Sequence, residues 1–139
     1  MTIKNVSFAV LAAAALAAPA IAHHSTAAFD TSKVVQVKGK ITQFRWINPH
    51  ASIKIDGEAE GDAIDGVWTV EMTAPNVLIN QGWKRNSLVV GDEVTIFVNP
   101  LRNAVELNDG SQGGLYVGAI LASGEKLGQT DGKGAGTSQ

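Results

Sequence analysis

The sequence predicts an all-β fold, a small closed barrel of five strands with one short helix between the third and fourth strands. Two observations carry this prediction. Short segments alternate apolar and polar residues with a period of two, which is typical of strands with one buried face. In the first segment this alternation changes parity near Thr42-Gln43, downstream of Gly39. The change indicates a β-bulge in a strand bent enough to serve both sides of a closed sheet.

The stretch 33–55 contains the first two predicted strands and the corner between them. Apolar residues alternate with polar ones up to Ile41, and after the expected bulge the apolar set continues as Phe44-x-Trp46. Asn48-Pro49-His50 is expected to turn the chain, because such residues favour turns. Ile53-x-Ile55 then marks the second strand.

The remaining elements follow in order. The acid-rich segment 56–66 is expected to be a solvated hairpin loop, since its acids do not have the spacing of a calcium-binding loop. Pro75 suits the first position of a short helix, and Gly82 suits a left-handed cap after it. The other expected strands are 67–73, 94–98 and 115–121, the last with Leu115, Val117, Ala119 and Leu121 on one face. This order is that of an OB-like barrel, although a small sandwich would give a similar series of strands.

The first 22 residues have the features of a secretory signal peptide. Lys4 precedes an apolar run over 6–18, and Ala20-Ile21-Ala22 fits the small-x-small cleavage rule. Cleavage after Ala22 would make His23 the mature amino terminus, and cleavage two residues earlier is the alternative. Because the chain has no cysteine, a cysteine-linked lipid anchor and disulfides are excluded. An exported chain of this kind suits a bacterial periplasm.

The expected domain organisation is a signal peptide over 1–22, a barrel domain over 23–127 and a disordered tail over 128–139. The tail is rich in Gly, Thr, Gln, Lys and Ser and offers little to bury. The mature segment would keep ten basic and all thirteen acidic residues, a formal charge of −3. That charge argues against a nucleic-acid partner and against binding to anionic lipid, and no membrane span is expected in the mature chain.

Four groups of short motifs occur in one order along the chain. They are His23-His24-Ser25 with Phe29-Asp30, Trp46-x-Asn48-Pro49-His50 after Gly39, Trp68-x-Val70-Glu71 with Pro75-Asn76-x-Leu78, and Gly82-Trp83 with Leu88-x-x-Gly91-Asp92-x-Val94. Together they resemble a family of small exported bacterial proteins described as a domain of unknown function. The resemblance extends from His23 to about Leu121 and implies an OB-like barrel and export, but no established activity. Ala74 stands where the resemblance leads us to expect a serine, which weakens the helix cap.

The three histidines of the chain suggest a copper site. If His23 carries the free amine, its amine and imidazole can chelate one ion, and His24 or His50 can add a third nitrogen. Planar nitrogen-rich sites suit Cu(II), the strongest binder among the divalent ions. The earlier cleavage would place His23 third, which is also a known type of copper chelate. Asp30 or Glu71 could add an oxygen ligand or orient a histidine.

Plainer interpretations of the same residues stay open. Paired histidines near a terminus are often unliganded, and His50 could simply hydrogen-bond across its corner. Glu71 should point away from the apolar face, where such a carboxylate is usually solvated or paired with a cation such as Arg45. The three tryptophans could form a stacking platform but more often pack in a core.

The sequence therefore favours a periplasmic, non-enzymatic binding protein that binds copper through His23, His24 and His50. A metal-free interaction module is the alternative, with the barrel edge or the Trp83-Lys84-Arg85 turn contacting a periplasmic protein. An enzyme is the third possibility, and copper redox chemistry is its one plausible route. No nucleophile elbow, phosphate loop or dinucleotide fingerprint is present in the sequence.

Overall fold

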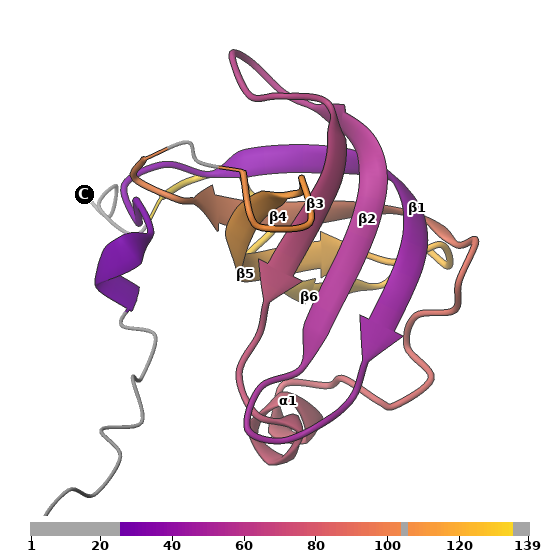
Figure 1. The fold of residues 1–139 in the computed structure, drawn as a ribbon. Helices are drawn as coiled ribbons and strands as arrows, with labels where there is room; N and C mark the ends of the chain where they lie inside the picture. The colour runs from indigo at the N-terminus through magenta and orange to yellow at the C-terminus, as the bar shows by residue number, and fades with distance from the viewer. Residues whose placement is uncertain (1–25, 104–105, 135–139) are drawn as a thin grey trace, which may run out of the picture.

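The computed structural model describes residues 26–103 and 106–134 (Figure 1). The expected signal peptide, with His23 and His24, lies outside these residues. The described elements are a short 3₁₀ helix Thr26–Ala28, β1 Val35–Arg45, β2 Ser52–Ala59, β3 Gly66–Glu71, α1 Pro75–Asn80, β4 Glu93–Pro100, β5 Gln112–Ile120 and β6 Lys126–Gly128.

Five of the strands form a closed barrel, as the sequence predicts. β1 lies between β2 and β4, β2 also pairs with β3, and β4 also pairs with β5, all antiparallel. A parallel pairing of β3 with β5 closes the ring. The single α-helix of the described residues lies between β3 and β4 in the sequence and covers one end of the barrel (Figure 1). The predicted OB-like architecture is confirmed.

The predicted bulge in β1 is present. Ile41 pairs with Ile55 whereas Gln43 pairs with Lys54, so Thr42 is the extra residue. The bulge lets apolar residues on both sides of it face the interior. Upstream, a Cβ atom built on Gly39 would lie 2.1 Å from the carbonyl oxygen of Asp56, so only glycine fits where β1 and β2 approach closely.

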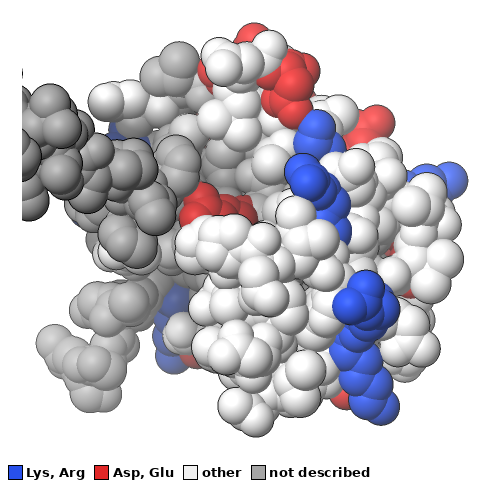
Figure 2. Space-filling view, turned by 60° about the horizontal axis from the view of Figure 1, so that its bottom comes forward, with Lys and Arg blue, Asp and Glu red and all other residues white. Residues whose placement is uncertain are grey.

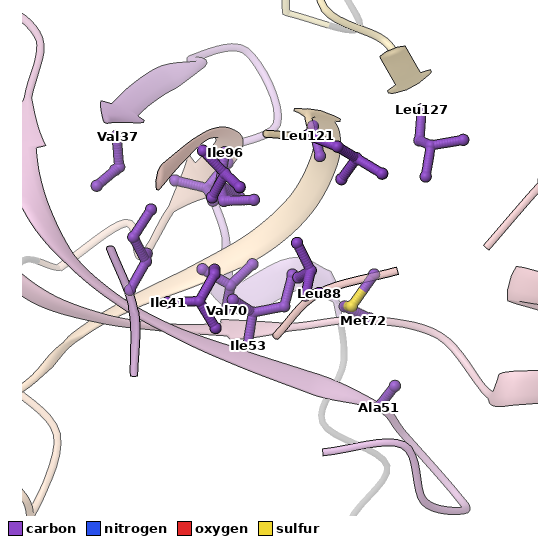
Figure 3. Packing of buried hydrophobic residues seen from close by; sticks show 14 of the residues in the cluster. Val37, Ile41, Ala51, Ile53, Val70, Met72, Leu88, Ile96, Leu121 and Leu127 are labelled. Carbon is purple, nitrogen blue, oxygen red and sulfur yellow. The ribbon is translucent and has the colours of Figure 1, made fainter. Parts of the chain in front are cut away.

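The barrel interior is filled by aliphatic side chains from every strand and by two tryptophans. Figure 3 shows part of this cluster, with side chains from opposite walls meeting in the middle. Trp68 and Trp83 are 3% and 1% exposed, so both belong to the core and do not form a stacking platform. α1 ends as predicted: Gly82 adopts φ +92°, and the N–H of Trp83 donates to the Leu78 carbonyl, which are features of a Schellman motif.

The hairpin between β2 and β3 is shorter than the sequence suggests. We expected a loop over 56–66, but β2 continues to Ala59 and the loop is confined to 60–65. The reason lies in the register, which places Asp56 opposite Lys40 and Glu58 opposite Lys38. Acids at every second position thus face cations on the neighbouring strand, an arrangement that favours strand pairing.

The predicted inward face of the fifth strand is wrong in its first half. β5 also contains a bulge. Phe97 pairs with Gly118 and Val98 pairs with Tyr116, so Val117 is the extra residue. Tyr116, not Leu115 or Val117, therefore packs against the core, whereas Ala119 faces inward as expected. β5 also begins earlier than predicted, at Gln112, where its first residues pair with β3 and close the barrel.

The chain remains structured beyond the predicted end of the domain at residue 127. Lys126–Gly128 forms β6 on the edge of β5, and the N–H of Gln129 donates to the Val117 carbonyl. A Cβ atom on Gly118 would lie 2.0 Å from the Gln129 carbonyl oxygen, so the small residues of this segment permit close backbone contact. The expectation of a disordered tail from Gly128 onward is therefore wrong for Gly128 and Gln129.

Candidate functional site

The three candidate metal ligands fall in two regions. His23 and His24 lie outside the described residues, two to three positions before Thr26. His50 lies in the loop that joins β1 to β2, directly after the cis peptide bond between Asn48 and Pro49. Its side chain is exposed, and within the described residues it makes no hydrogen bond across the corner.

Within the described part of the chain, no three residues among His, Asp and Glu gather closely enough to hold a metal ion. A metal site built from three such side chains would therefore include a residue outside those described. The two undescribed histidines precede the amino-terminal arm, the chain before β1, which meets the barrel near the end of β4.

Phe29 anchors this arm to the barrel, as its sequence predicts, because Phe29 is the one large apolar residue of the polar segment 26–32. Phe29 is 6% exposed, and its backbone forms a β-bridge with that of Leu101. The N–H of Asp30 donates to the Pro100 carbonyl at 2.8 Å, which fixes the backbone beyond the ring. The arm is therefore attached to the end of β4 before β1 begins.

Asp30 caps the turn that follows. Its Oδ1 accepts hydrogen bonds from the N–H and the hydroxyl of Ser32, and its Oδ2 lies 3.5 Å from Lys33 Nζ. The hydrogen bonds from Ser32 are the main reason that the pKa of Asp30 is lowered. Because its oxygens are engaged in the turn, Asp30 is a poor candidate for a metal ligand.

A hollow of about 330 Å³ separates the arm from the outer face of the barrel. We call it the arm hollow. The arm forms one side, and β2 and β3 form another where β2 starts and β3 ends. The β4–β5 connection, residues 101–111, and the start of β5 form the rest. Its lining residues are Ala28, Phe29, Ser52, Thr69, Glu71, Leu101, Leu107, Gly113 and Gly114.

Glu71 supplies the negative charge of the arm hollow. It is half-buried at the end of β3, directly opposite Ser52 in the β2–β3 register. No hydrogen bond or ion pair engages its carboxylate within the described residues. The pairing that we considered with Arg45 is not formed. In the register Ser52 is the neighbour of both, so Arg45 and Glu71 lie on either side of it.

A group of hydrogen-bonded side chains, which we call the clamp, holds the β4–β5 connection against the outer face of β2 and β3. Lys54 Nζ lies 2.6 Å from Asp109 Oδ2, and the Ser111 hydroxyl donates to Asp109 Oδ1 at 2.6 Å. Ser111 and Thr69 hydroxyls are 2.8 Å apart. The hydrogen bond from Lys54, with those from Ser111, lowers the pKa of Asp109 well below its usual range. The sequence indicates only turns here, and these partners are far apart in the chain.

A second polar chain runs through the interior near α1. Trp83 Nε1 donates to the Tyr116 hydroxyl at 3.1 Å, and that hydroxyl donates to the Leu127 carbonyl at 3.0 Å. Burial raises the pKa of Tyr116 to about 12. Since Trp83 is 1% exposed, it cannot contact a partner as part of the Trp83-Lys84-Arg85 turn, whereas Lys84 and Arg85 are exposed.

The surface bears no large patch of one charge on the face shown in Figure 2. Small basic and acidic groups are separated there by uncharged surface. None of the helices in the described residues is long and apolar enough to cross a membrane.

Comparison with known proteins identifies the family. No curated protein and no solved structure matches the chain. The sequence model described as "Family of unknown function (DUF6152)" matches residues 10–114, about three quarters of the chain. This agrees with the resemblance that the motifs suggested. The chain belongs to the DUF6152 family.

Proposed function

We propose that this protein is a non-enzymatic binding protein of the periplasm, exported by a cleavable signal peptide, and that it binds copper(II). The ligands are the free amine and imidazole of His23 with the imidazoles of His24 and His50. One observation carries the proposal: Ala28 and Phe29, just after the two histidines, line the same hollow as Ser52, just after His50.

Chain length allows these groups to meet. His24 is four residues before Ala28, and His50 is two residues before Ser52. A fully extended chain spans at most about 3.5 Å per residue, so the two histidines can reach about 14 Å and about 7 Å from their anchors. Because Phe29 is buried, it tethers the chain to the barrel close to the two histidines. A short tether of this kind gives the histidines a high effective concentration at the barrel surface.

The donor set favours copper over other divalent ions. One amine and two or three imidazoles are nitrogen ligands, which suit Cu(II) in a planar arrangement. His50 is exposed, so its imidazole is accessible to an ion. The site depends on signal cleavage, because only cleavage creates the free amine at His23.

A competition titration against a chromogenic copper chelator tests this proposal. The protein is exported, purified with its native amino terminus, and checked by mass spectrometry for a start at His23. We expect saturation at one Cu(II) per chain. His23→Ala or acetylation of the terminal amine should abolish tight binding. His50→Ala should weaken it about tenfold, equivalent to about 1.4 kcal/mol.

Lys38→Ala is the matched control, because Lys38 is an exposed residue of β1 far from the histidines in the register. It should bind copper like the wild type. Absence of saturable binding by the native chain, or equal binding by the acetylated chain, would remove the copper proposal.

A metal-free interaction module is the second candidate, and one observation favours it. Val89 and Val90 are 59% and 68% exposed, shortly after the exposed Lys84 and Arg85. Exposed apolar side chains that lie together mark interaction sites, and arginine is enriched in protein interfaces. A partner that binds in the presence of a chelator, and is lost from a Val89→Ser/Val90→Ser double variant, would support this function. Equal recovery with the double variant would exclude this surface.

A further inference from the structure

We propose that the arm hollow binds a small organic cation, a primary ammonium group on a short apolar body, with the ammonium against Glu71. The proposed site consists of described residues alone and does not depend on copper. It assigns a second ligand class to the same exported binding protein.

The walls of the arm hollow are mostly apolar. Phe29 and Leu101 hold one side together through their β-bridge, and Leu107 lies on the rim with 37% of its surface exposed. A Cβ atom on Gly113 would lie 2.6 Å from Leu101 Cδ1, so a larger residue would not fit at this position. The backbone of Gly113 therefore lines the hollow without a side chain. A ligand with an apolar body would cover Leu107 and the other apolar walls, which favours binding.

The polar groups of the arm hollow are concentrated at the ends of β2 and β3. Glu71 and Ser52 face each other across the two strands, and neither side chain has a hydrogen-bond partner within the described residues. A carboxylate beside a hydroxyl forms an acceptor pair suited to an ammonium group, which offers three donors. Thr69, the other polar side chain of the lining, is already bonded to Ser111.

Charge selects a cation over an anion. Of the described residues that line the arm hollow, Glu71 alone is charged, and no lysine or arginine is among them. Lys54, on the same face of β2, is engaged by Asp109 at 2.6 Å. Arg45 lies beyond Ser52 from Glu71 and does not line the arm hollow. A half-buried carboxylate without a cation attracts a positive ligand and repels a carboxylate.

The size of the arm hollow limits the ligand. A volume of about 330 Å³ is at the small end for ligand pockets, so it suits a single ring or a short alkyl chain. The walls are held by the Phe29–Leu101 bridge and by the clamp of Lys54, Asp109 and Ser111, so the site is preformed. Preformed sites lose less entropy on binding.

Amide chemical-shift titration of the chain beginning at His23, with a chelator present to remove copper, tests the proposal. The probes are 2-phenylethylammonium, the neutral 2-phenylethanol and the anionic phenylacetate. We expect the ammonium to cause saturable shifts at Gly113, Gly114 and Thr69, with a dissociation constant on the order of 0.1–1 mM. The alcohol should bind at least about tenfold more weakly, and the anion should cause no saturable shift.

Variants separate the charge from the shape of the site. Glu71→Gln should weaken ammonium binding about tenfold and remove the preference over the alcohol. Ala28→Trp, which fills the arm hollow from an exposed position, should abolish binding. Glu58→Gln is the matched control, an exposed carboxylate of β2 that does not line the hollow and should not change binding.

Three outcomes would overturn the proposal. They are the absence of saturable shifts at the lining residues, equal binding of the ammonium and the alcohol, and unchanged affinity in Glu71→Gln. Failure of the copper titration alone would leave this site intact, because the chelator removes copper from the measurement.

Discussion

The polar chain inside the barrel and the polar end of the arm hollow differ in how their groups are satisfied. In the interior, Trp83 donates to Tyr116, and Tyr116 donates to the Leu127 carbonyl. In the arm hollow, Glu71 and Ser52 face each other without hydrogen-bond partners within the described residues. Satisfied buried groups stabilise a fold, whereas an unpaired carboxylate at a hollow retains its capacity to bind. We therefore expect substitutions in the first region to change stability and substitutions in the second to change the proposed binding.

Removal of Trp83 should have the largest effect on stability. Trp83 is 1% exposed and packs against Phe44 and Tyr116 with ring centroids 6.0 and 5.4 Å apart. Trp83→Ala should lower the free energy of unfolding by about 3–5 kcal/mol, because it leaves a cavity and removes the N–H that donates to the Tyr116 hydroxyl. Urea unfolding measures this loss.

Trp46→Ala is the control, since Trp46 is only half-buried at the edge of the same cluster. Its effect should be clearly smaller. Equal losses for the two variants would contradict the special role of the interior chain in stability.

The pKa of Tyr116 tests the burial of the interior polar chain by a property other than unfolding. Tyr116 is the one tyrosine of the sequence, so tyrosinate absorbance reports on it alone. Because burial raises its pKa to about 12 from an ordinary 10.0, the unfolded chain releases this proton first as the pH rises. Stability from this group should be complete below pH 10.0 and should be lost as the pH rises towards 12. A midpoint near pH 10.0 in the folded protein would show that the hydroxyl is not buried.

The clamp beside the arm hollow should have the smallest effect on global stability. Lys54 and Asp109 are partly exposed, and exposed ion pairs contribute little to folding. Asp109→Asn should instead increase hydrogen exchange at the Ser111 amide, whose N–H donates to Asp109 Oδ1. It should also weaken ammonium binding through a looser wall. A global loss as large as that of Trp83→Ala would contradict this division of roles.

The pH dependence of the clamp follows from the lowered pKa of Asp109. A carboxyl group with a lowered folded pKa stabilises the protein above its unfolded pKa, and this contribution is lost as the pH falls through the folded value. Exchange at Ser111 should therefore stay slow, after correction for intrinsic rates, as the pH falls to about 4 and should rise only in stronger acid.

The barrel could be predicted because its signals are local. Alternating residues, the parity change at Thr42 and the Pro75 and Gly82 signals each concern only a few neighbouring positions. The bulge at Val117 could not be predicted, because apolar residues and glycines occupy both faces of β5 there. Without alternation there is no parity change to reveal a bulge. β6 is three residues long, too short to show a period.

The candidate site could be predicted only in part. The sequence singled out the three histidines and the anchoring role of Phe29, and the structure confirms the anchor. It could not show that Glu71 lacks a partner, because that depends on the register of β2 with β1 and β3. Nor could it join Lys54 to Asp109, which are 55 positions apart in the chain.

Electron paramagnetic resonance of the mature protein with equimolar copper(II) is the sharpest test of the proposed copper site. The hyperfine structure counts the nitrogen ligands, and we expect an axial spectrum with at least three of them, as planar nitrogen-rich Cu(II) sites give. His50→Ala should lose one coordinated imidazole while His23 keeps the ion bound. A spectrum identical in the wild type and His50→Ala, or one of unbound copper, would contradict a site shared by the arm and the barrel.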